Sequence, residues 1–432
     1  MRKALIITYY WPPSGGSSVL RWLKFTKYLR EFGWEPVIYT PENPESQEID
    51  ELLLREIPEN IEILKTKIRE PYTLYKWITG RKKEERLGVS LMSDKKVPGI
   101  ITRLSLWVRS NLFIPDPRCL WINPSVKQLS RYLSGNPVDI IITTGPPHSM
   151  HLIGLGLKKK LGIKWLADFR DPWTNIDFYS DLLLTRFADR KHKKLERDVL
   201  IHADCVVSVS PTWTKELRDL GAKRVQTIMN GFDDETGISV PDDKEKKFSI
   251  LHLGSIPLSR NPEEFWKVLA ELVRENHSFA SLLQIRLIGK VDLKVIEALE
   301  TNNLKDFLKY DSFIPHDKTY RQLTAASVLL LIINNTPNSG GILTNKFYEY
   351  LSAHRPILAL GPVEGDAAKI LHDTGAGKIF PYADTDNIKH HLKTLFDLHL
   401  QNKLTVSPKE INKFSRKSLT HELSILLDNL TS

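Results

Sequence analysis

Two adjacent glycines between a strand pattern and a helix pattern are the first residues that could bind an anion. Tyr9 to Ser18 follows an apolar run and opens a long amphipathic stretch, with Gly15 and Gly16 at its centre. Glycine lets backbone amides approach an anion closely, and a helix N-terminus adds partial positive charge. We expect this loop to contact a phosphate or an acceptor; a plain tight turn is the alternative. The segment lacks the Gly-x-Gly-x-x-Gly fingerprint, which disfavours a nicotinamide enzyme.

A second glycine segment, Asn338 to Tyr350, contains the chemically richest helix start in the chain. Thr344 precedes the helix pattern, Lys346 places a cation in its first turn, and Glu349 follows one turn later. Such a helix start suits phosphates, and a carboxylate beside it could accept both hydroxyls of a ribose. The alternative is an exposed Lys346–Glu349 ion pair, worth only a few tenths of a kcal/mol.

Three further residues follow another expected strand in the same half of the chain. Gly254 and Ser255 end the strand, and Arg260 precedes the next helix pattern. Their amides and guanidinium could bind a diphosphate, although Arg260 could equally be a solvated surface charge. No zinc-like Cys/His cluster or Walker loop occurs, so we expect neither a metal nor a cofactor besides a nucleotide substrate.

Acid and base candidates occur in the first half of the chain. Asp168, Arg170 and Asp171 end an expected strand, where a carboxylate could act on an acceptor hydroxyl or could belong to a structural ion-pair network. His148 and His151 follow Gly-Pro-Pro and are further candidates, with a loop or helix-cap role as the alternative. We name Asp171 and His148 as the catalytic candidates.

The elements that position these residues are short apolar strands alternating with amphipathic helices. Strands apolar throughout and separated by helices are typical of parallel sheets covered on both faces. The expected strands are 4–8, 35–40, 61–64, 139–143, 165–168, 205–209, 248–253, 284–288, 328–333 and 357–360. The expected helices include 19–32, 124–133, 149–161, 263–275, 318–325 and 345–353.

The pattern restarts after Asn230-Gly231-Phe232 and a polar segment. We therefore expect an α/β protein of two Rossmann-like domains, residues 1–235 and 236–412, facing across a cleft. Ligands bind at the carboxyl ends of the strands in such sheets. A last helix, Phe414 to Leu430 within residues 413–432, should cross back to the first domain.

Residues 72–121 interrupt the alternation and are rich in basic residues. The segment includes Arg81, Lys82, Lys83 and Arg118 together with Trp77, Trp107, Leu112 and Phe113, and it predicts a helix over 99–112. Cations interleaved with apolar residues favour docking on an anionic membrane surface. Packing of the apolar residues on the first domain, with solvated charges, is the alternative.

Composition narrows the function class. The net charge of +9 suits anionic partners, but no nucleic-acid-binding motif appears, so we expect none to bind. The apolar run after Met1 ends at Trp11-Pro12-Pro13, which favours a buried strand over a signal peptide. The two cysteines have no metal or redox spacing. We expect a cytoplasmic protein, peripheral at the inner face of the membrane.

These segments together resemble retaining glycosyltransferases of family 4, which have the GT-B fold. The resemblance runs through nearly the whole chain and is most specific at Ala167 to Trp173 and Lys346 to Pro356. It implies a C-terminal domain that binds a nucleotide sugar and an N-terminal domain that binds a saccharide or lipid-linked acceptor. It also implies envelope or extracellular polysaccharide synthesis.

The resemblance assigns roles by position. Glu349 resembles the second glutamate of the Glu-x7-Glu motif, which contacts the ribose; Gly15 and Gly16 resemble the glycine-rich phosphate loop, and Arg260 the diphosphate-binding cation. Gly341 stands where the first motif glutamate belongs, which leaves the donor sugar and the stereochemical outcome unassigned. A nucleotide-sugar epimerase of the same fold and a non-catalytic nucleotide-sugar-binding protein are the alternatives.

Overall fold

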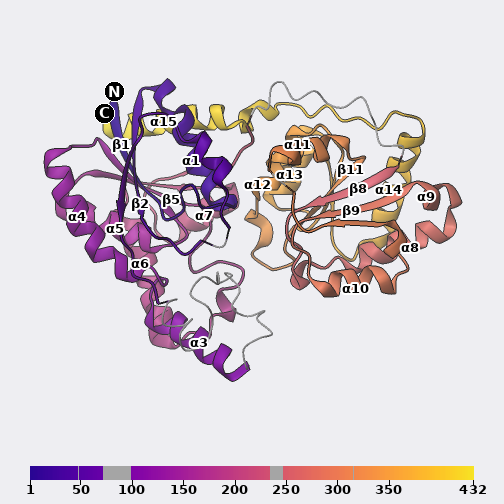
Figure 1. Cartoon of the computed structure of the whole chain (residues 1–432), viewed down its shortest axis with the longest axis horizontal. Helices are drawn as coiled ribbons and strands as arrows, with labels where there is room; N and C mark the ends of the chain where they lie inside the picture. The colour runs from indigo at the N-terminus through magenta and orange to yellow at the C-terminus, as the bar shows by residue number, and fades with distance from the viewer. Residues whose placement is uncertain (47, 72–98, 234–246, 315) are drawn as a thin grey trace. The chain divides into compact units, whose positions relative to one another are not determined.

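The computed structural model describes residues 1–46, 48–71, 99–233, 247–314 and 316–432 (Figure 1). Its contacts divide the chain into two compact units. Unit 1 is Met1–Met229 with Arg416–Ser432, and unit 2 is Asn230–Ser415. No helix in these described ranges is long and apolar enough to cross a bilayer.

Unit 1 is built on a seven-stranded parallel sheet in the order β3-β2-β1-β4-β5-β6-β7. The strands are β1 (Arg2–Ile7), β2 (Trp34–Pro41), β3 (Glu62–Thr66), β4 (Ile140–Gly145), β5 (Lys164–Phe169), β6 (Cys205–Ser208) and β7 (Val225–Thr227). The helices are α1 (Ser17–Leu29), α3 (Gly99–Leu112), α4 (Ile122–Gly135), α5 (Ser149–Leu161), α6 (Arg186–His202), α7 (Pro211–Asp219) and α15 (Arg416–Thr431).

Successive residues of the central strand β1 supply two different cores. Leu5 and Ile7 join the core under α4 and α5, whereas Ala4 and Ile6 join the core under α1 and α15. A strand buried on both faces has to be apolar throughout, which is why it appears in the sequence as a continuous apolar run. The last helix, α15, packs beside α1 (Figure 1).

Unit 2 repeats this architecture with six parallel strands in the order β10-β9-β8-β11-β12-β13. The strands are β8 (Phe248–Leu253), β9 (Leu283–Ile288), β10 (Leu308–Asp311), β11 (Val328–Ile332), β12 (Ile357–Leu360) and β13 (Gly377–Phe380). The helices are α8 (Glu263–Glu275), α9 (His277–Leu282), α10 (Leu293–Thr301), α11 (His316–Ala325), α12 (Asn345–Ser352), α13 (Asp366–Thr374) and α14 (Thr385–Leu400).

The predicted α/β class with two parallel sheets is confirmed, and the strands expected from apolar runs are all present. Three strands were missed: β7, β10 and β13, each at the edge of its sheet. The helix predicted over 99–112 is confirmed as α3. Trp77, Arg81, Lys82 and Lys83 lie outside the described residues, and the predicted cleft stays a prediction.

Candidate functional site

In each unit the direction of chain winding reverses once, and the predicted ligand-binding residues flank that reversal. In unit 1 it falls between β1 and β4, and in unit 2 between β8 and β11. The carboxyl ends of the strands at such a point splay apart, which makes a natural ligand crevice. Gly254 and Ser255 directly follow β8, and Thr344 lies in the connection from β11 to α12.

Lys346 and Gly254 form the centre of the unit 2 site. A Cβ atom placed on Gly254 would lie 2.9 Å from Nζ of Lys346, so the ammonium lies against the end of β8. Gly254 has φ of +112°, a conformation that residues with side chains rarely adopt. Glycine at this position therefore both permits the turn and leaves room for the lysine.

The amine of Lys346 is buried and forms no hydrogen bond with the described residues around it. Burial is the main cause that lowers the pKa of Lys346 to about 7; the positive charge of Arg260 acts in the same direction, and Glu349 acts in the opposite direction. A buried cation without a counter-ion is costly. An anionic ligand bound beside Lys346 and Arg260 would therefore offset the cost of burying the lysine charge.

The alternative of an exposed Lys346–Glu349 ion pair is wrong for Lys346. Its amine is buried, and no ion pair joins the two side chains among the described residues. Glu349 is half-buried one turn along α12. The ribose contact of Glu349 stays a prediction.

Further polar groups lie on α12 or in the connection from β11 to α12, and of these only Thr344 was predicted from the sequence. Tyr350 accepts a hydrogen bond from the amide of Leu253 at 2.8 Å, which ties α12 to the end of β8. The hydroxyl groups of Thr336 and Thr344 are buried without a partner in the described ranges. The position of Tyr350, four residues after Lys346 and thus on the same helix face, was the signal that could have identified it.

His252 lies behind the lysine on β8 and is fully buried. Its Nδ1 lies 2.9 Å from the carbonyl oxygen of Leu330, so Nδ1 carries the proton and Nε2 does not. Burial holds the pKa of His252 well below its usual range, and the charge of Lys346 acts in the same direction. His252 is therefore a neutral residue that joins β8 to β11 across the reversal.

In unit 1, Arg170 holds together the loops that follow three adjacent strands. Its guanidinium donates to the carbonyl oxygen of Ser18 at 3.1 Å and to that of Pro146. Its backbone amide donates to the carbonyl oxygen of Gly145 at 2.9 Å. The loops after β1, β4 and β5 therefore form one surface, and they carry Gly15, Gly16, His148 and Asp171.

The role predicted for the Gly15–Gly16 loop needs a correction. The amide of Gly15 already donates to the carbonyl oxygen of Glu48 at 2.9 Å, so it is not free to bind an anion in this structure. A Cβ atom on Gly16 would lie 3.4 Å from Oε2 of Glu48, which places a carboxylate beside the loop. Gly16 also has φ of +84°, so any side chain there would strain the backbone with or without a ligand.

The two carboxylates near Arg170 have different environments. Asp168 is fully buried and accepts from Arg21 at 2.9 Å, from Trp22 at 2.7 Å and from Thr144 at 2.9 Å. Burial would raise its pKa, but these donors hold it below the ordinary value. Asp168 is thus a structural residue whose direct ion-pair partner is Arg21, and the charge of Arg170 adds to the stabilisation of its carboxylate.

Asp171 has the opposite electrostatic character. It is half-buried, and burial raises the pKa of its carboxyl group against the lowering effect of Arg170. No hydrogen bond to its side chain occurs within the described residues. A carboxylate that is partly desolvated and not saturated by donors can still accept a proton or a hydroxyl hydrogen bond. This environment is compatible with the predicted catalytic role, which stays a prediction.

His148 lies at the start of α5 in a buried aromatic cluster. Its ring stacks on Trp173, with centroids 4.7 Å apart and planes 4° apart. Burial holds the pKa of His148 well below its usual range, with nearby His151 acting in the same direction. His148 is therefore neutral, and its Nδ1 has no hydrogen-bond partner among the described residues. A neutral imidazole at this position can accept or donate a hydrogen bond without carrying charge.

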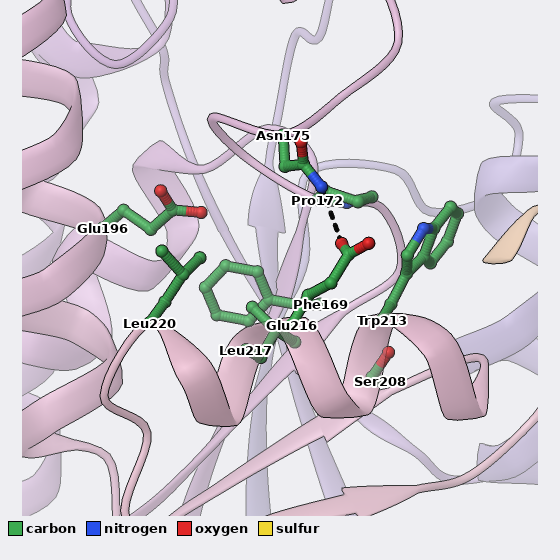
Figure 2. Close-up of a pocket in the computed structure, with 9 residues that line it drawn as sticks. All are labelled: Phe169, Pro172, Asn175, Glu196, Ser208, Trp213, Glu216, Leu217 and Leu220. Carbon is green, nitrogen blue, oxygen red and sulfur yellow. Dashed lines mark hydrogen bonds between the residues drawn. The ribbon is translucent and has the colours of Figure 1, made fainter. Parts of the chain in front are cut away.

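A small pocket lies beside the unit 1 candidates, at the ends of β5 and β6 (Figure 2). It encloses about 260 Å³ including open solvent, and Phe169, Trp213 and Leu217 line it. Asn175 and Glu216 also line it, and Asn175 donates a hydrogen bond to Glu216 at 2.7 Å. Within the described ranges, no three His, Cys, Asp or Glu residues gather as a metal site would require.

Comparison with known proteins agrees with this architecture. Glycosyltransferase Family 4 matches residues 19–236, and no curated protein matches the sequence significantly. Sucrose-phosphate synthase from Thermosynechococcus elongatus aligns over 100% of this chain and 99% of its own, with a TM-score of 0.63 and 15% identity.

Two further solved structures are similar as well. TarM of S. aureus, solved with fondaparinux, alpha-GlcNAc-glycerol and UDP, aligns over 100% of both chains, with a TM-score of 0.61 and 10% identity. WaaG, a glycosyltransferase involved in lipopolysaccharide biosynthesis, aligns over 98% of this chain and 99% of its own, with a TM-score of 0.57 and 12% identity. At these identities the likeness shows the fold alone.

Proposed function

Because the chain belongs to Glycosyltransferase Family 4 and has the GT-B fold, we propose that it is a glycosyltransferase. In this proposal it transfers a glycosyl group from a nucleoside-diphosphate sugar to a saccharide or lipid-linked acceptor. The family match spans just over half of the chain. The likeness to solved structures extends over both units. The class of reaction comes from the family, and the assignment of groups to it comes from the geometry of each unit.

The observation that carries the proposal is the buried, unpaired ammonium of Lys346 against Gly254 in unit 2. Cleavage of the donor leaves a nucleoside diphosphate with additional negative charge. Preorganised cations and amides stabilise such developing charge most strongly in a site with little water. We assign Lys346, Arg260 and the amides at Gly254 and Ser255 to the diphosphate, with Thr344 beside them, and Glu349 to the ribose hydroxyls.

Unit 1 supplies the acceptor side in this proposal. Asp171 is the group that handles the acceptor hydroxyl, because its carboxylate is partly desolvated and is not saturated by donors. His148 positions the reacting sugars through a neutral imidazole. The Gly15–Gly16 loop contacts the donor in this proposal through the amide of Gly16, because the amide of Gly15 is bonded to Glu48.

The proposal includes no metal and no cofactor besides the nucleotide sugar. Lys346 and Arg260 provide the positive charge that a divalent cation supplies in other transferases. Retention of configuration and a hexosyl donor are expectations from the family resemblance. We place the protein in the cytoplasm, peripheral at the inner face of the membrane, in envelope or extracellular polysaccharide synthesis; no role for nucleic acid is proposed.

A thermal-shift panel with UDP, GDP and ADP tests the donor site. UDP is the first probe because the similar TarM structure contains it. A ligand that binds only the folded state increases the free energy of unfolding by mass action, by about 2.7 kcal/mol at a hundredfold excess over Kd, and so raises the melting temperature. We expect one nucleotide to raise the melting temperature and Lys346→Met to remove the effect. A panel without any shift would contradict the proposed function.

The absence of a side chain at Gly341 supports two alternatives to a glycosyltransferase activity. Gly341 lies buried in the short helical segment Ser339–Gly341 and has no side chain to contact a donor sugar. The protein would then be an epimerase of the same fold or a non-catalytic nucleotide-sugar-binding protein. Incubation with the donor alone separates these: an epimerised sugar indicates the first, and tight nucleotide binding without transfer to any acceptor indicates the second.

A further inference from the structure

Helices α3 and α6 of unit 1 contact each other (Figure 1), and the side chain of Asn111 on α3 bonds to the segment that precedes α6. The side-chain amide of Asn111 donates to the carbonyl oxygen of Leu183 at 3.1 Å, and its oxygen accepts from the amide of Thr185 at 2.7 Å. Thr185 then caps α6 by accepting from the amide of Ala188. The C-terminus of α3 and the N-terminus of α6 therefore form one continuous surface, which we name the α3–α6 face.

Large apolar side chains are exposed on this face. Leu104 and Trp107 precede Asn111 by seven and four residues, which places them on the side of α3 that meets Leu183. The exposed fractions are 60% for Leu104, 40% for Trp107, 64% for Leu112, 39% for Leu183 and 74% for Phe187. Leu106, on another side of α3, is buried. A gathering of exposed apolar residues of this kind marks an interaction site.

The exposed side of α6 adds cations next to these apolar residues. Phe187, Arg190, Lys191 and Lys194 have the spacing i, i+3, i+4, i+7 and are all exposed, so they form one stripe along the helix. The opposite side of α6 is buried through Ala188, His192 and Val199. Arg186 and Arg103 are also exposed. The face thus combines apolar side chains with a positively charged border.

Acidic residues near this stripe do not cancel its charge. Asp189 accepts from Lys193 at 2.9 Å and from Tyr179, and it points away from Arg190 and Lys191 by its helix position. Asp198 is half-buried and lies one turn beyond Lys194, at the far end of the stripe. The part of α6 next to Phe187 is therefore cationic.

We propose that the α3–α6 face docks the protein on an anionic membrane surface. The proposal rests on the proposed function, because a membrane-docked transferase would meet a lipid-linked acceptor at that surface. Aromatic and leucine side chains enter the interface between headgroups and acyl chains, while cations bind anionic headgroups. Each such cation contributes about fivefold to the partition coefficient, equivalent to about 1 kcal/mol.

This surface shares Trp107 and Leu112 with the one that the sequence suggested but differs from it in its cations. Arg118, one of the basic residues of the predicted insertion, is buried; it pairs with Glu70 at 3.0 Å and lies over the ring of Tyr9. It cannot contact a lipid without breaking that ion pair. Phe187 and the cations of α6 lie outside the predicted insertion.

Co-sedimentation of the full chain with vesicles tests the proposal. One set of vesicles is phosphatidylcholine alone, and the other is phosphatidylcholine with about 30 mol% of the anionic lipid phosphatidylglycerol. We expect the protein to prefer the anionic vesicles, with binding that falls as salt rises. The combined variant Arg190→Glu, Lys191→Glu and Lys194→Glu should bind about 100-fold more weakly, and Phe187→Ser should also weaken binding.

A matched control makes the same change in net charge elsewhere on unit 1. Lys159→Glu, Lys160→Glu and Lys164→Glu alter exposed residues at the end of α5 and the start of β5, at the amino edge of the sheet. This control should keep vesicle binding. Equal losses in both charge-reversed variants, or equal binding to both vesicle types, would overturn the proposal.

Two further measurements separate this proposal from its alternatives. If the face were an interface between two copies of the chain, Phe187→Ser would change the mass in light scattering and the protein would not bind vesicles, which overturns docking. A nucleotide thermal shift measured on every variant tests the proposed function separately from membrane docking. Nucleotide binding without vesicle binding refutes docking alone, whereas vesicle binding without nucleotide binding refutes the proposed function.

Discussion

Replacement of Lys346 by methionine should stabilise the protein below neutral pH and remove its affinity for nucleoside diphosphates. Methionine is an unbranched side chain of similar length that fills irregular space in protein interiors. The substitution therefore keeps the packing around Gly254 while it removes a buried ammonium that has no hydrogen-bond partner in the described ranges. Sites that bind a charged ligand commonly carry such a cost in the free protein.

The magnitude follows from the pKa of Lys346. The pKa of Lys346 falls from an ordinary 10.5 to about 7 in the folded protein. Between these values the unfolded chain binds more protons than the folded chain, so the free energy of unfolding rises with pH. The destabilisation is complete below about pH 7 and is relieved as pH approaches 10.5. At 1.36 kcal/mol per pH unit its upper limit is about 5 kcal/mol, and water penetration lowers it to about 2–5 kcal/mol.

Urea denaturation of the wild type and Lys346→Met at pH 6 and pH 9.5 measures this effect. The variant should be more stable by about 2–5 kcal/mol at pH 6, and the difference should shrink to about 1 kcal/mol at pH 9.5. Lys267→Met is the control, because Lys267 is exposed and forms a surface ion pair with Glu264 on α8. Its effect should stay within about 0.5 kcal/mol at both pH values.

Calorimetric titration with a nucleoside diphosphate completes the test. If a charged Lys346 binds the diphosphate, the wild-type affinity should fall about tenfold per pH unit above about pH 7, because the lysine must take up a proton on binding. The reasoning is refuted if Lys346→Met is less stable than the wild type at pH 6. It is equally refuted if the variant keeps wild-type affinity for the nucleotide.

The remaining predictions concern other groups. Glu349→Ala should weaken nucleoside-diphosphate binding by about 1.5–3 kcal/mol in calorimetry without lowering the melting temperature; unchanged affinity would remove Glu349 from the site. Asp171→Asn should lower the transfer rate by about 100-fold or more in a product assay while nucleotide affinity stays constant, and full activity would leave it a structural residue. Arg21→Met should destabilise the protein by about 3–5 kcal/mol in urea denaturation, because it strands the buried carboxylate of Asp168; a neutral effect would contradict that pairing. Transfer should continue in excess EDTA, and an activity restored only by a divalent cation would show that a metal is required.

The interior strands could be predicted because burial on both faces leaves a local trace in composition. Ile140 to Ile142 and Val328 to Ile332 are continuous apolar runs, and both are buried throughout. Three of the four edge strands leave no such trace; the fourth, β3, was predicted from the apolar residues Ile61, Ile63 and Leu64. β7, β10 and β13 have mostly half-buried or exposed residues, since one of their sides has no neighbouring strand.

The position of the candidate site was likewise accessible from local signals. Glycines and polar residues at the ends of apolar runs identify the carboxyl edge of a parallel sheet, and Gly254 and Thr344 both lie there. The environment of each side chain was not accessible. The sequence could not show that Glu48 accepts from the amide of Gly15, because 33 positions separate the two residues.

The sequence by itself determined the fold class, the two sheets and the strand ends from which a ligand can be reached. These properties depend on periodicity and turn residues within a few positions of one another. The tertiary structure decided which charges are paired and which are not. Asp168 is held by Arg21 and Trp22, 147 and 146 positions away, whereas Lys346 is buried against Gly254 without a partner among the described residues. Burial and charge pairing arise from contacts between distant segments, and they set the protonation and reactivity of each group.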